Sequence, residues 1–154
     1  MNKRVFGRKL SRSRPAREAL FASLAQSLIL NGRIVTTRAK AKAVQASVEK
    51  MVTLAKAGDL AARRSVMGKL DNARESADIL FQKVAKAFSA KNSGFTRIIS
   101  LPRRVGDNAQ MVRMEWTEKV EIESKKKEEK PAEAKTAVKK EKKVVKKAVK
   151  IVEK

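Results

Sequence analysis

Residues 34–57 read IVTTRAKAKAVQASVEKMVTLAKA, and this stretch carries the clearest periodicity in the chain. It opens with a short β-type run, Ile34-Val35-Thr36, after which apolar residues recur every three or four positions. Such spacing places side chains on one face of a helix, which Thr36 or Thr37 can cap. The expected stripe comprises Ala41, Val44, Val48, Met51, Val52 and Ala55. The stretch therefore predicts a strand followed by a helix with one buried face.

A further helix is predicted upstream of this stretch. Pro15 and Glu18 suit a first helical turn, because proline needs no backbone partner there and a carboxylate meets the positive end of the helix dipole. The pair Asn31-Gly32 ends the helix, since glycine readily adopts a left-handed conformation. The apolar stripe of this helix comprises Leu20, Phe21, Leu24, Ala25 and Leu28.

Two helices are predicted downstream. Gly58-Asp59 breaks the periodicity and can start a short helix over residues 60–70. Asn72 and Glu75 have the spacing of a capping box for the next helix. The stripe of that helix comprises Ala77, Leu80, Phe81, Val84 and Phe88.

Two strands are predicted after the turn at residues 92–94, over residues 95–101 and 111–116. In the second, apolar and polar residues alternate as they do in a half-buried strand. The order is helix, short strand, three helices and two strands. It predicts an α+β fold in which the helices pack on a small mixed sheet.

The charge divides the chain of 154 residues into three parts, with 38 basic and 16 acidic side chains giving +22 in all. Residues 1–17 hold seven basic side chains and no acidic one, and we expect an RNA-binding arm that is extended until a partner orders it. Residues 18–117 hold the apolar stripes and are the expected body. Residues 118–154 mix 14 basic with 8 acidic side chains and are expected to be a low-complexity Lys/Glu/Ala/Val tail without fixed structure.

Several function classes are excluded by composition. The chain has no cysteine and no histidine, which excludes disulfide scaffolds, Cys/His zinc sites and Cys/His nucleophilic catalysis. No apolar run reaches the ~18–20 residues of a membrane span. The chain lacks the motif of a phosphate-binding P-loop, because Arg63 stands where that motif has its first glycine, ahead of Gly68-Lys69. We expect no enzyme activity, no cofactor or metal and no small-molecule substrate.

The basic side chains are the feature of the sequence that indicates a function. Arginine grips phosphate through a planar fork of donors, so an arginine-rich arm favours nucleic acid as the partner. Arg103 and Arg104 sit in a loop that can present them to phosphate. Arg38, Lys40 and Lys42 begin a helix beside Thr36 and Thr37, and the free backbone N–H groups there can form an anion site. The acidic residues Asp71, Glu75 and Asp78 are interpreted as helix N-terminal acids, with a magnesium site as the alternative.

A series of motifs, in one uninterrupted order over about residues 1–117, resembles the bacterial large-subunit ribosomal protein seventeen family. The motifs are GRKLSR at 7–12, REALF at 17–21, LAQSL at 24–28, IVTT at 34–37, KAK at 40–42, TLAK at 53–56, GFTRI at 94–98 and RVGDNA at 104–109. The tail beyond Glu118 departs from the many shorter members of the family.

This resemblance implies a structural protein of the large (50S) ribosomal subunit that acts in translation, in the cytoplasm. It also implies that the chain binds large-subunit ribosomal RNA through contacts to the phosphate backbone, with neighbouring ribosomal proteins as further partners and no membrane. The candidate RNA-binding residues are Lys3, Arg4, Arg8, Lys9, Arg12, Arg14, Arg17, Arg33, Arg38, Lys40, Arg97, Arg103 and Arg104. The alternatives are a histone-like nucleoid DNA-binding protein, which the basic tail favours, and a membrane-surface binder using the valines of the tail.

Overall fold

The computed structural model describes residues 7–120 of the chain. The expectations for Lys3 and Arg4, and for the tail from residue 121 onward, lie outside these residues. None of the helices within residues 7–120 has the length and apolar content that a membrane crossing requires.

The described residues form helices and strands in the predicted order, which confirms the α+β fold class. The elements are α1 (Arg14–Asn31), β1 (Arg33–Thr37), α2 (Arg38–Ala57), α3 (Leu60–Lys69), α4 (Arg74–Ile79), a π-helical segment η1 (Leu80–Val84), α5 (Ala85–Ala87), β2 (Thr96–Ser100) and β3 (Met111–Trp116). The segments α4, η1 and α5 make one continuous helical run, because the residues at their junctions all have right-handed helical angles. That run is the fourth helix predicted from the sequence.

The three strands form one sheet in the order β1-β3-β2, with the last strand of the body in the middle. Both pairs are antiparallel, so the sheet is not the mixed one expected from the sequence. The loop between β2 and β3 reverses the chain and makes that pair antiparallel. Strand β1 then runs parallel in direction to β2 but pairs only with the central strand. Its register sets Ile34 beside Met114 and Thr36 beside Val112.

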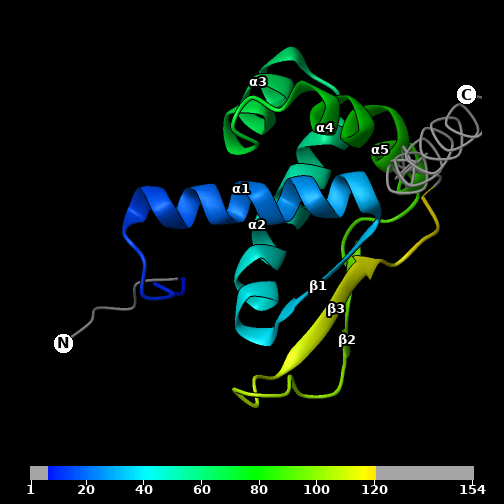
Figure 1. Cartoon of the computed structure of the whole chain (residues 1–154). Helices are drawn as coiled ribbons and strands as arrows, with labels where there is room; N and C mark the ends of the chain where they lie inside the picture. The colour runs from blue at the N-terminus through cyan, green and yellow to red at the C-terminus, as the bar shows by residue number, and fades with distance from the viewer. Residues whose placement is uncertain (1–6, 121–154) are drawn as a thin grey trace, which may run out of the picture. The chain divides into compact units, whose positions relative to one another are not determined.

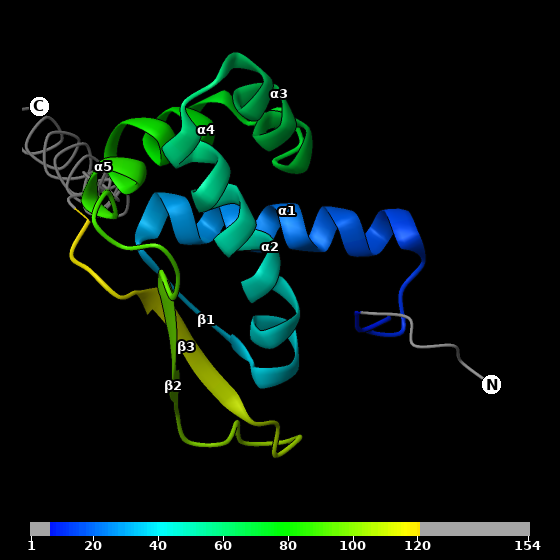
Figure 2. The ribbon, with the colours of Figure 1, turned by 180° about the vertical axis from the view of Figure 1, so that it is seen from behind.

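Helix α2 lies at the centre of the helical layer and packs on the sheet as well as on α1 and α3 (Figures 1 and 2). All six residues of its predicted stripe are buried, which confirms the periodicity in residues 34–57. In β3 the predicted alternation is also confirmed, since Val112, Met114 and Trp116 are buried and the residues between them are partly exposed. The core therefore forms around α2, between the sheet and the other helices, since α1, α3 and the run from α4 to α5 contribute buried residues as well.

The predicted end of α1 is confirmed, whereas the predicted side-chain cap of α2 is not formed. Gly32 ends α1 in a left-handed conformation, with φ of 73°, and its N–H donates to the Leu28 carbonyl over 2.8 Å. Thr37 holds the cap position of α2, but its side chain makes no capping hydrogen bond. In α1 the predicted stripe is fully buried at Ala25 and Leu28, whereas Leu20, Phe21 and Leu24 are only partly buried. The N-terminal end of this helix extends past the body (Figure 1).

The predicted capping box of Asn72 and Glu75 is wrong. The residue before α4 is Ala73, whereas Asn72 adopts a left-handed conformation with φ of 58°. The Asn72 N–H donates to the carbonyl of Met67 over 2.9 Å. Asn72 therefore closes the end of α3 instead of starting the next helix, a role that asparagine fills because it tolerates left-handed angles.

Replacing Gly32 with alanine is expected to lower the free energy of unfolding by about 1–2 kcal/mol, because a Cβ atom disfavours the left-handed conformation that ends α1. Urea unfolding followed by circular dichroism measures this change. Ser27→Ala, a partly exposed position on the same helix, is the control and should shift the midpoint much less. Equal effects of the two variants would contradict the assignment of Gly32 as the helix end.

Candidate nucleic-acid interface

The start of α2 gathers positive charge. Strand β1 passes directly into α2 at Arg38, and the first turn of the helix contains no acidic residue. Arg38 and Lys40 therefore stand at the end of a helix that already carries a partial positive charge from its backbone dipoles. This placement is unfavourable in the protein alone and becomes favourable when an anion binds there.

The residue before β3 contacts this first turn. The N–H of Arg38 donates to the Gln110 carbonyl over 2.9 Å, and the Arg38 guanidinium donates to Gln110 Oε1 over 3.3 Å. The N–H of Arg38 is therefore already bonded, which removes one of the backbone donors expected to be free at this helix start. Gln110 also orients the Arg38 side chain at this helix start.

Two neighbouring concavities surround Arg38. The larger, of about 470 Å³, is lined by Arg8, Thr37, Arg38, Ala39, Lys42, Ala109 and Gln110. The smaller, of about 200 Å³, is lined by Arg38, Ser100, Leu101, Arg103, Gln110, Met111 and Val112. No acidic side chain of the described residues lines either one. We call Arg8, Arg38, Lys42 and Arg103 the basic surface.

A further concavity, of about 510 Å³, lies beside the middle of α2. Its walls include Glu49 and the apolar side chains of Leu54 and Phe95. It therefore lacks the uniform positive charge of the basic surface.

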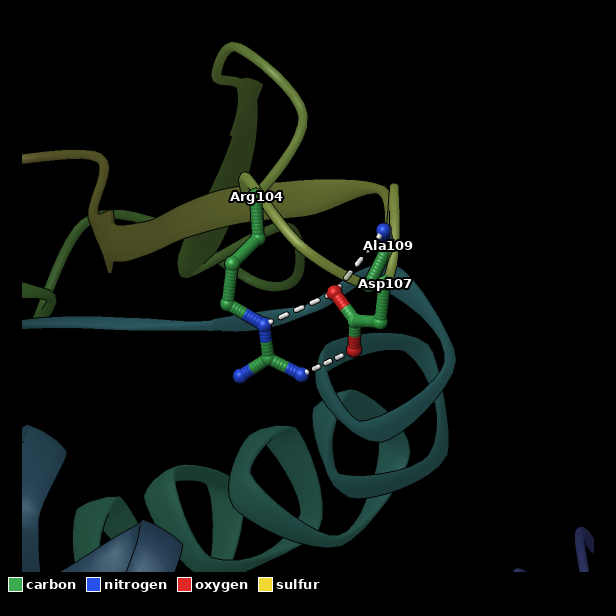
Figure 3. Close-up of polar contacts among 3 residues, drawn as sticks. All are labelled: Arg104, Asp107 and Ala109. Carbon is green, nitrogen blue, oxygen red and sulfur yellow. Dashed lines mark hydrogen bonds and ion pairs between the residues drawn. The ribbon is translucent and has the colours of Figure 1, made fainter.

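The loop between β2 and β3 contains a tight turn held by contacts among Arg104, Asp107 and Ala109 (Figure 3), and Ala109 lines the larger concavity. The Arg104 guanidinium donates to both carboxylate oxygens of Asp107, over 3.0 Å from Nε and 2.5 Å from Nη2. The N–H of Ala109 donates to Asp107 Oδ1 over 3.2 Å. The hydrogen bonds from Arg104, followed by the one from Ala109, lower the pKa of Asp107 to about 2. The same ion pair raises the pKa of Arg104.

Other candidate residues lie away from the basic surface. Arg33 and Arg97 stand on the outer face of the sheet, each opposite Glu115 in the strand register, and Arg97 pairs with Glu115 over 2.6 Å. Arg14 and Arg17 are part of α1, so the last residues of the expected arm are helical. Arg14 pairs with Glu18 over 2.9 Å, and the pKa of Arg14 is raised by this contact.

The described part of the arm forms a turn. Leu10 and Ser11 have left-handed angles, and the N–H of Arg12 donates to the Lys9 carbonyl over 3.1 Å. Lys9 and Arg12 are exposed and line neither concavity. Lys40 lines neither of them either, although it lies in the same helical turn as Arg38.

One residue at the basic surface, Gln110, was not indicated by the sequence. Lys42, which was considered for the anion site although it is not among the thirteen candidates, follows Arg38 by four positions and lines the same concavity. Gln110 is neutral and sits outside any recognisable motif, so nothing in the sequence indicated its contact with Arg38.

The three acids considered for magnesium do not form a metal site. Asp71 has a left-handed conformation in the turn before α4, and Asp78 pairs with Arg63 of α3. Within residues 7–120, no three acidic side chains are placed to hold a metal ion together.

A family model and several curated proteins that this chain resembles all belong to the same protein family. A family model described as ribosomal protein L17 matches residues 20–117. The large ribosomal subunit protein bL17 of Gemmatimonas aurantiaca is 46% identical over 115 residues, which cover 75% of this chain and 97% of the relative. The bL17 protein of Persephonella marina is 45% identical over 119 residues, covering 77% and 96%. That of Oenococcus oeni is 43% identical over 128 residues, covering 72% and 98%.

Proposed function

Because the chain belongs to the ribosomal protein L17 family, whose members are structural constituents of the large ribosomal subunit, we propose that it binds large-subunit ribosomal RNA through arginine and lysine contacts to the phosphate backbone. The family is non-enzymatic, and its members belong to the cytoplasmic ribosome, in association with ribosomal RNA and other ribosomal proteins. The family membership favours the ribosome over the nucleoid and the membrane surface considered from composition.

The basic surface is the observation that carries this proposal. Arg8, Lys42 and Arg103 have no carboxylate partner among residues 7–120, and Arg38 is oriented by a neutral glutamine. Four cations around two adjoining concavities attract a chain of phosphates more strongly than scattered surface charges do. Arginine adds bidentate hydrogen bonds to phosphate oxygens.

The aromatic residues support recognition of the backbone over recognition of bases. Phe88, Phe95 and Trp116 are buried in the core, and Phe21 and Phe81 are partly buried against it. Within the described chain, no aromatic ring is therefore left as a platform for stacked bases. Contacts to phosphate and sugar orient a protein on RNA through the shape of the RNA rather than its sequence.

Binding of the full-length protein to deproteinised large-subunit RNA is expected to weaken steeply with salt. The logarithm of the association constant should fall with the logarithm of the salt concentration with a slope of several, because each neutralised phosphate contributes about 0.7–0.9. Filter binding or fluorescence titration in excess transfer RNA measures this slope. A slope near zero, or equal affinity for duplex DNA, would contradict the proposal.

The basic surface is tested by replacing Arg38, Lys42 and Arg103 together with glutamine. The slope should fall by roughly 2, because three phosphate contacts are removed. A matched control replaces three exposed cations of the helical layer, Arg64, Arg74 and Lys86, and removes the same charge. The control should keep the wild-type slope, and equal losses in both variants would assign binding to net charge alone.

A further inference from the structure

We propose that Arg104 and Asp107 act as a clasp that positions the basic surface for RNA, and that Arg104 is a positioning residue and not an RNA contact. The inference rests on the proposed function and deepens it. It revises the expectation, drawn from motif position, that Arg104 itself binds RNA.

The clasp closes the turn at residues 105–108. The N–H of Arg104 donates to the Ala109 carbonyl over 3.0 Å, and Asp107 accepts from the Ala109 N–H and from the Arg104 guanidinium. Side chain and backbone therefore join the same two ends of the turn. Within this turn Gly106 and Asn108 both have positive φ angles, of 105° and 52°, and Val105 is 99% exposed. With so little packing at the tip, the clasp is the main contact that maintains its shape.

The residues on either side of the turn connect the clasp to the basic surface. Ala109, which the clasp holds, lines the larger concavity and is followed directly by Gln110. Gln110 accepts hydrogen bonds from both the backbone and the guanidinium of Arg38. On the other side of the turn, Arg103 precedes Arg104 and lines the smaller concavity. A shift of the turn would therefore move Arg38 and Arg103 together.

The charges at the clasp argue against a direct RNA contact by Arg104. Asp107 offsets the positive charge of Arg104 and occupies the forked Nε and Nη2 face that arginine uses for bidentate binding of phosphate. The contacts with Arg104 and Ala109 lower the pKa of Asp107 to about 2, so the carboxylate is ionised and able to pair with Arg104 at the neutral pH of RNA binding. An acid beside a phosphate-binding surface is electrostatically unfavourable, and its contribution here is to the shape of the turn.

Asp107→Asn distinguishes a positioning role of the clasp from a purely electrostatic effect of Asp107, because the two predict opposite changes in RNA affinity. The variant keeps the size of the side chain and raises the net charge by one, so simple electrostatics predicts tighter RNA binding. The clasp predicts weaker binding. We expect the affinity of the full-length protein for deproteinised large-subunit RNA to fall about tenfold at 0.1 M salt, and the slope to fall by roughly 1, as contacts by Arg38 and Arg103 are misaligned.

A second variant and a spectroscopic measurement keep the test independent of folding. Arg104→Lys keeps the charge but not the forked geometry, and it should weaken binding as Asp107→Asn does. In NMR spectra of the RNA-free protein, both variants should shift the side-chain signals of Gln110 and Arg38 while leaving the core amides in place. Unchanged affinity of Arg104→Lys would overturn the positioning role.

Asp71→Asn is the matched control. It also removes one acid, and asparagine tolerates the left-handed conformation at this position, which lies in the turn before α4. It should bind RNA as well as the wild type or slightly better. If the wild type binds with a steep salt slope and Asp107→Asn binds more tightly, the clasp is refuted while the proposed function stands. A wild type that shows no salt-dependent binding refutes both.

Discussion

Replacing Phe88 with alanine is expected to lower the free energy of unfolding by about 3–5 kcal/mol, the usual loss for a fully buried phenylalanine. Phe88 follows α5 and is completely buried. Its ring contacts those of Phe95 and Trp116, with centroid distances of 5.3 Å and 5.9 Å, and so joins the helical run to the sheet. Domains are usually stable by ~5–15 kcal/mol, so the variant should be near the edge of folding.

Phe81→Ala is the matched control for this prediction. Phe81 belongs to the same helical run but is only partly buried, with the Arg63 guanidinium 5.7 Å from its ring centre. Its replacement should reduce stability by less than half as much. Chemical unfolding of the two variants side by side measures the difference, and comparable losses would show that the aromatic contact around Phe88 is not central to the core.

Deletion of residues 2–13 is expected to give the second large effect, a fall in large-subunit occupancy of roughly tenfold or more when the variant competes with the full-length protein. The deletion removes five cations and no acid. Each phosphate contact that a cation makes contributes about 0.7–0.9 to the salt slope, so the losses multiply. The deletion also removes Arg8 from the wall of the larger concavity. Quantification of tagged protein in purified subunits measures the occupancy.

A truncation of the other end is the comparison. We place it after Val120, because Val120 still packs against the core. The residues removed, 121–154, contain 13 basic and 7 acidic side chains, and the acids reduce the field of the lysines. This variant should keep nearly normal occupancy. We propose on this basis that arm and body suffice for incorporation. If the truncated chain were lost and the arm deletion retained, the two roles would have to be exchanged.

Periodic segments explain why much of the fold could be predicted from sequence. In α2 and β3 the apolar spacing follows from the repeat of the helix and of the strand, and burial of one face is all that the fold adds. At Asn72 the prediction failed because a local pattern cannot distinguish the residue that closes one helix from the residue that starts the next. The pairing of β1 with β3 was equally hidden, since it depends on contacts between distant parts of the chain.

The candidate site, like the fold, could be predicted from the sequence only in part. Composition indicated arginine and lysine as candidate binding residues, but the thirteen candidates could not be reduced to one surface without knowing which of them lie close together. The structure brings Arg8, Arg38 and Arg103 together and adds Lys42. It pairs Arg104 with Asp107, two residues of one motif whose spacing does not reveal an ion pair. Such partners depend on the shape of a turn, which side-chain periodicity does not describe.

The central position of β3 has a consequence for the order of events during synthesis. Strands β1 and β2 are made before β3, yet each of them pairs only with β3. A nascent chain that ends before residue 111 therefore has two strands whose hydrogen-bonding edges have no neighbour in the sheet. The helices can begin to pack earlier, because their contacts are closer in the chain. The sheet can be completed only when the last strand of the body emerges, and until then the nascent protein is open to mispairing with other chains.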